Sequence, residues 1–96
     1  MKRKFVVDVP AEEMVELERL WYEYNASRDI IAFLMQQKGV IWETLQEYIN
    51  VSEKRFTECE MKKVSLATNY KPAEVDLTKF NYSFDFQDDK ITFEEA

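Results

Sequence analysis

Two long stretches of the chain, residues 11–37 and 41–68, repeat apolar side chains at helical spacing and meet at Gly39. Apolar residues that recur every three or four positions are typical of an amphipathic helix. Gly39 suits the left-handed conformation that ends a helix and lets the chain turn back. The pattern therefore predicts an antiparallel helical hairpin, with helix 1 over residues 10–38 and helix 2 over residues 40–69.

Helix 2 carries a seven-residue repeat that indicates how the two helices pack. One row is Trp42, Ile49 and Phe56, and the other is Leu45, Ser52, Cys59 and Leu66. A repeat of this length is typical of a coiled-coil seam. Folding the chain at Gly39 then sets Tyr24 near Phe56 and Ser27 near Ser52, so that two small residues share one layer.

The two ends of the chain predict β-strands. Residues 1–9 contain a short β-branched run, residues 70–79 read as a connector, and residues 80–94 alternate as a hairpin does. A two-residue turn at Asp88-Asp89 would pair Phe86 with Ile91 and Phe84 with Phe93. In an antiparallel helix pair both ends emerge together, so we expect the first strand to pair with the hairpin, within the chain or across an oligomer. The predicted fold is α+β, one domain over residues 1–96.

An apolar band at the end of helix 1 has no evident cover. The run from Ile30 to Met35 is apolar on nearly all sides, and Trp42 lies close by at the start of helix 2. A single partner helix covers one side of such a band only. We therefore expect a contact surface for another protein at Ile30, Phe33, Leu34 and Trp42.

The C-terminal hairpin presents a second candidate surface. Its first strand alternates so that four aromatic residues share one face, and a two-stranded hairpin buries little by itself. We expect this face to pack against another protein element; its residues are Phe80, Tyr82, Phe84 and Phe86.

Charge and composition narrow the classes of partner. The formal net charge is −6 and the pI is about 4.7, which disfavours nucleic acid and anionic membrane surfaces. No apolar run reaches the length of about 18 residues that a membrane span needs, and the run after the basic N-terminus is too short for a signal peptide. The partners we expect are other copies of the chain or a larger protein assembly, with a cytoplasmic or virion-associated location.

Candidate chemistry is sparse. The chain has no histidine and a single cysteine, Cys59, at a seam position where we expect it to be buried and unreactive. The acidic cluster of Asp85, Asp88 and Asp89 lacks the spacing and the glycine of a calcium loop. We therefore expect no enzyme activity, no metal and no cofactor.

One family resemblance bears on function. The segment Tyr70-Lys71-Pro72-Ala73-Glu74, placed just after helix 2, is similar to the Tyr-x-x-x-Asp/Glu tail of the WXG100-type secreted proteins, which are also helical hairpins of about a hundred residues. Their Trp-x-Gly turn is missing here, and a strand precedes helix 1. The primary hypothesis is a non-enzymatic structural or accessory subunit, for instance of a phage-type particle. The alternatives are a secreted WXG100-like effector and an acidic inhibitor that mimics nucleic acid.

Overall fold

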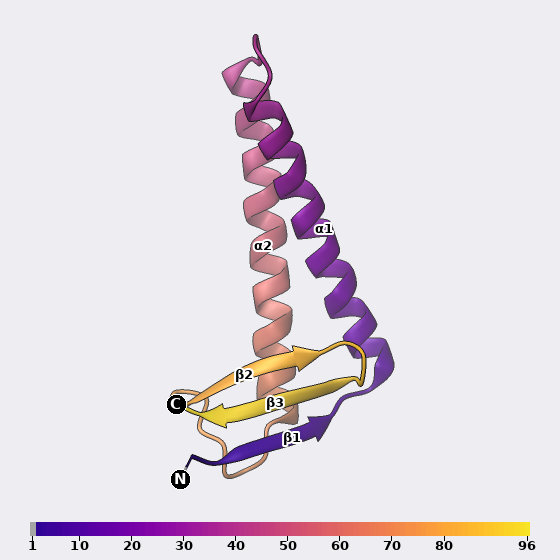
Figure 1. Ribbon diagram of the computed structural model, residues 1–96, viewed down its shortest axis with the longest axis vertical. Coiled ribbons are helices and arrows are strands. Elements are labelled where there is room, and N and C mark those ends of the chain that lie inside the picture. The colour runs from indigo at the N-terminus through magenta and orange to yellow at the C-terminus, as the bar shows by residue number, and fades with distance from the viewer. Residues whose placement is uncertain (1) are drawn as a thin grey trace.

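The computed structural model describes residues 2–96 and confirms the predicted α+β architecture (Figure 1). Two long helices form an antiparallel hairpin, and a three-stranded antiparallel sheet lies across its open end. The elements in chain order are β1 (Lys4–Asp8), α1 (Ala11–Met35), α2 (Trp42–Tyr70), β2 (Phe80–Asp85) and β3 (Lys90–Glu95).

The molecule is elongated, with principal extents of 55 × 27 × 18 Å. Its radius of gyration is 17.1 Å, whereas a compact domain of this length has a value of about 12 Å. The difference arises because the helical hairpin extends well beyond the sheet. The far end of the hairpin therefore has only its own two helices for packing.

The first helix begins as predicted and ends earlier than predicted. The carbonyl of Pro10 accepts hydrogen bonds from the backbone N–H groups of Glu13 and Met14, at 3.1 and 3.3 Å. The helix ends at Met35 and not at residue 38, because the N–H of Gln36 bonds to the carbonyl of Phe33 at 3.1 Å in a tighter turn. Gly39 follows with φ of +85°, in the left-handed conformation that the sequence predicts.

The predicted helix register is confirmed at two layers. The Oγ atoms of Ser27 and Ser52 are hydrogen-bonded at 3.1 Å. The ring centroids of Tyr24 and Phe56 are 5.2 Å apart.

The predicted seam nevertheless fails at the turn, where Trp42 is 65% exposed. Its layer partner would be residue 37 or 38, and α1 has already ended there, at Met35. Trp42 therefore has no helix opposite it to pack against. The second row of the seam is buried at Ser52, Cys59 and Leu66.

The sheet has the order β1-β3-β2, so the last strand of the chain is central. The N-terminal strand pairs with the C-terminal hairpin within one chain, with Phe5 opposite Phe93 and Val7 opposite Ile91. This confirms the predicted partner for the N-terminal strand. Phe93 and Ile91 are both fully buried, because the sheet covers them on both sides and the helices cover their face.

The predicted hairpin register is wrong by two residues. Phe84, and not Phe86, lies opposite Ile91, and Tyr82 lies opposite Phe93. The cause is the Asp85 side chain, whose Oδ1 accepts hydrogen bonds from the N–H groups of Gln87 and Asp88 at 3.0 and 3.1 Å. This Asx-type turn lengthens the connection between the strands beyond Asp88-Asp89. A shift of two residues keeps the same side chains on the same face.

The buried core lies at the sheet end of the molecule. There the helix bases, the connector before β2 and the inner face of the sheet pack together (Figure 1). Its buried apolar residues are Val9, Met14, Leu17, Cys59, Leu66, Ala67, Val75, Phe80, Ile91 and Phe93. Between Arg28 and Val51 no residue is buried.

Candidate interaction surface

The segment from Arg28 to Val51 comprises the end of α1, the turn and the start of α2, and we call it the distal tip. Its apolar side chains are accessible. Ile30 is 44% exposed and Phe33 is 61% exposed, while Leu34 is half-buried between the helices. With Trp42, these are the residues that the sequence predicts as a contact surface, and the structure brings them together at one end of the molecule.

Sequence reasoning missed further members of this surface. Ile41, Tyr48 and Val51 are also exposed apolar side chains of the distal tip, beside Met35 of the predicted band. Tyr48 and Val51 lie outside the seam rows of α2. This position on the helix was the signal in the sequence that could have predicted their exposure. Ile41 directly precedes α2 and is 64% exposed.

The distal tip is poor in charge. Its charged residues are Arg28, Asp29, Lys38, Glu43 and Glu47. None of them forms an ion pair within residues 2–96. The guanidinium of Arg28 lies 5.6 Å from the ring centroid of Tyr24, on the side of the sheet. The tip therefore offers mainly apolar contacts, with unpaired charges between them.

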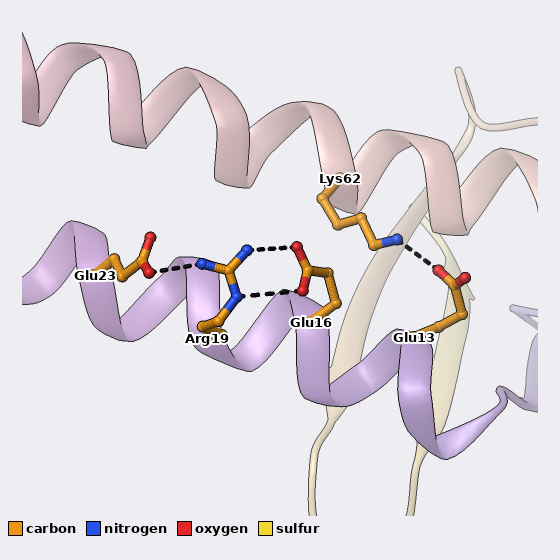
Figure 2. A network of polar contacts seen from close by, with 5 residues as sticks. All are labelled: Glu13, Glu16, Arg19, Glu23 and Lys62. Carbon is orange, nitrogen blue, oxygen red and sulfur yellow. Dashed lines mark hydrogen bonds and ion pairs between the residues drawn. The ribbon is translucent and has the colours of Figure 1, made fainter.

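The half of the hairpin next to the sheet carries a strip of paired charges (Figure 2). Arg19 donates to Glu16 and to Glu23, both at 2.6 Å, along one face of α1. These hydrogen bonds hold the pKa of the Glu16 carboxyl below its usual value and raise that of the Arg19 guanidinium. Lys62 reaches across from α2 to Glu13 at 2.5 Å. These ion pairs form a solvated strip along this half, whose other exposed residues include the apolar side chains of Val15, Tyr22, Met61 and Val64.

The aromatic face of β2 is largely used within the chain. Phe80 is only 4% exposed, and its ring lies 6.1 Å from that of Phe5. Tyr82, Phe84 and Phe86 are half-buried against the core. The rest of the sheet and the bases of the helices thus cover much of the aromatic face that the sequence predicts for contact with another protein.

A hollow of about 420 Å³ remains where β2 meets the helices. It is lined by Trp21 from α1, by Glu60 and Lys63 from α2, and by Tyr82, Phe84 and Phe86. Lys63 donates to Glu60 at 3.1 Å beside it. The hollow could not be found from sequence, because it depends on how the sheet is seated on the helices.

The single cysteine lies in the buried core. Cys59 is 1% exposed, and burial raises the pKa of its thiol above the usual value. Within residues 2–96 no three side chains are grouped as ligands for a metal ion. Neither helix of that part of the chain is long and apolar enough to cross a membrane. Comparison of the chain with protein-family models, with curated proteins and with solved structures finds no match.

Proposed function

We propose that this protein is a non-enzymatic structural subunit that joins other copies of itself through the distal tip, as part of a larger protein assembly. The observation that carries the proposal is the distribution of burial. The buried core lies at the sheet end, while no residue of the tip is buried and seven of its large apolar residues are at least 40% exposed. A phage-type particle is an assembly of this kind, with a cytoplasmic or virion-associated location.

The exposed apolar area is of the size that protein interfaces use. Phe33 and Trp42 are 61% and 65% exposed, and aromatic side chains at such fractions expose roughly 100–150 Å² each. Summed over all its exposed apolar side chains, and not as one contiguous patch, the tip offers on the order of 700 Å². The largest apolar patch on a typical monomer is about 300–600 Å², and a specific interface takes roughly 800 Å² from each partner.

The charge pattern supports this proposal over mimicry of nucleic acid. A mimic needs rows of free carboxylates that stand in for phosphates. On the helices here, Glu13, Glu16 and Glu23 are paired with Lys62 or Arg19. A secreted effector of the WXG100 type remains the alternative that the tail segment at Tyr70 favours. It would use the same helices without needing oligomerisation through the tip.

Substitution at the tip tests the proposal. Phe33→Glu places a carboxylate in the apolar surface, and we expect light scattering to report a lower mass than for the wild type. Tyr22→Glu is the matched control, because Tyr22 is a 58% exposed aromatic residue of α1 outside the tip. Both variants should keep their helical circular dichroism, since neither side chain is buried. Equal masses for the wild type and both variants would contradict the proposal.

A further inference from the structure

The β2 strand is a free edge of the sheet, and its unused backbone groups can be identified. The carbonyl of Lys79 accepts a hydrogen bond from the N–H of Ala96 at 2.9 Å, so Lys79 faces the β3 side. Backbone groups alternate in direction along an antiparallel strand. The N–H and C=O groups of Phe80, Tyr82 and Phe84 therefore point away from β3, toward the free edge.

Charged residues flank this edge only at its ends, with Lys79 just before β2 and Asp85 as its last residue. Lysine, proline and bulges discourage pairing with further strands, and β2 contains none of them between Phe80 and Asp85. The other edge, β1, carries Lys4 and is followed by Pro10. The two edges of the same sheet thus differ, and β2 is the one open to pairing.

The free edge faces a floor made by the helices. Figure 1 shows that α1 and α2 continue beyond β2 toward the turn, so a strand added to β2 would lie across them. The hollow lined by Trp21, Tyr82 and Phe84 lies between the edge of β2 and the helices. A second hollow of about 400 Å³, lined by Tyr24 and Phe56 among others, follows along the hairpin.

Both hollows lie on one face of the hairpin. Trp21 and Tyr24 are three residues apart on α1, and Phe56 and Glu60 are four apart on α2. Residues at these spacings share a helix face. The face that the sheet covers at the base of the hairpin therefore continues, uncovered, beside the edge of β2.

We propose that the edge of β2 and this helix face together bind one extended segment of another protein by strand addition, independently of the distal tip. The backbone groups of Tyr82 and Phe84 supply the hydrogen bonds, and the hollow at Trp21 takes a large apolar side chain. Alternate residues of the bound segment point toward the surface of α1 and α2. A basic residue at the end of the segment beside Asp85 suits this carboxylate, in a chain whose net charge is −6.

The occupant is a single segment and not the β2 strand of a second copy. Antiparallel pairing of two β2 strands would make one continuous sheet, with both helix layers on the same side of it. The helices of one copy already run through that space beyond β2 (Figure 1). Two complete copies would therefore collide, whereas a lone strand leaves its outer face open to solvent.

The probe for the test is the acetylated peptide Lys-Val-Thr-Leu-Thr-Val-Lys, whose apolar residues alternate. In a Trp42→Phe variant the remaining tryptophan is Trp21, which is 41% exposed at the hollow. We expect the peptide to shift the emission of Trp21 to shorter wavelength with a dissociation constant below about 1 mM. We also expect it to protect the amides of Tyr82 and Phe84 from hydrogen exchange.

Two controls decide how the peptide binds. The same peptide N-methylated at alternate amides keeps its side chains and loses strand pairing, so its binding should weaken at least tenfold. Phe84→Ala should weaken binding as well, whereas Phe33→Ala at the distal tip should not. Equal binding of the methylated peptide, or no response of Trp21 and the β2 amides, would overturn the proposal.

Discussion

The Oγ atoms of Ser27 and Ser52 are hydrogen-bonded at 3.1 Å across the two helices, and both residues are buried. The Oγ of Ser27 also donates to the carbonyl oxygen of Tyr24 at 2.6 Å, so the two serine hydroxyls have hydrogen-bond partners within the helix interface. The pair marks a boundary in the molecule. Every buried residue within 2–96 lies at this layer or on its sheet side, and the distal tip begins directly beyond it.

Ser52→Leu should therefore loosen the hairpin. The larger side chain cannot fit where two small residues allow close helix approach, and such overpacking costs about 1–3 kcal/mol. Urea unfolding followed by circular dichroism measures the loss. Ser65→Leu, at an exposed position of the same helix, should change stability by less than about 0.5 kcal/mol. Equal effects of the two substitutions would show that the Ser27 layer is not tightly packed.

Cys59 should react slowly with a thiol reagent in the native state. Its side chain is 1% exposed, and burial raises the pKa of the thiol, so little thiolate forms near neutral pH. Because the raised pKa belongs to the folded state, stability should fall as the pH rises above the ordinary thiol value near 8.5. Stoichiometric labelling under native conditions, as fast as in urea, would contradict the buried position.

Deletion of residues 1–7 should abolish folding and not merely assembly. The deletion removes most of β1, which covers the central strand at Ile91 and Phe93, both 0% exposed. It also removes Arg3, whose backbone carbonyl accepts from the N–H of Glu95 at 2.9 Å. Amide spectra of the truncated chain provide the measurement. A well-dispersed spectrum with the β3 amides still protected would contradict the role of β1.

The ion pair of Arg3 and Glu95 should contribute a small, acid-sensitive stabilisation. The Nη2 of Arg3 donates to Oε2 of Glu95 at 3.0 Å, which holds the pKa of this carboxyl below its usual value. A pKa lowered by folding stabilises the protein above the ordinary carboxyl value, and the effect is lost as the pH falls through the lowered value. Arg3→Ala should raise the pKa of Glu95 in a carbon-13 titration. An unchanged titration curve would mean that the pair does not form in solution.

Element types and the helix register follow from sequence periodicity, and the strand partner follows from the antiparallel helix pair, which brings both chain ends together. The spacing of Ser27, Tyr24 and their partners determines the layers, because each helix repeats at a fixed interval. The hairpin register does not follow from periodicity. A shift of two residues leaves every side chain on its face, so the alternation at Phe84 and Phe86 fits both registers equally well.

The candidate surfaces divide in a similar way. The apolar band at Ile30 and Phe33 is recognisable from sequence, because a helix that is apolar on all sides needs more cover than one partner gives. The exposure of Trp42 cannot be recognised from sequence, because it depends on α1 ending at Met35. The proposed binding surface beside the edge of β2 cannot be recognised from sequence, because it depends on the position of the sheet on the helices, which no local pattern encodes.

The accessibility of Trp42 tests the central claim most directly, because this side chain is 65% exposed in the single chain. In a Trp21→Phe variant it is the sole tryptophan, and acrylamide quenching reports on it alone. The account predicts that Trp42 is shielded at high protein concentration, and that dilution or Phe33→Glu makes it accessible as the mass falls to that of one chain. A folded monomer whose Trp42 is freely quenched at every concentration would contradict the account.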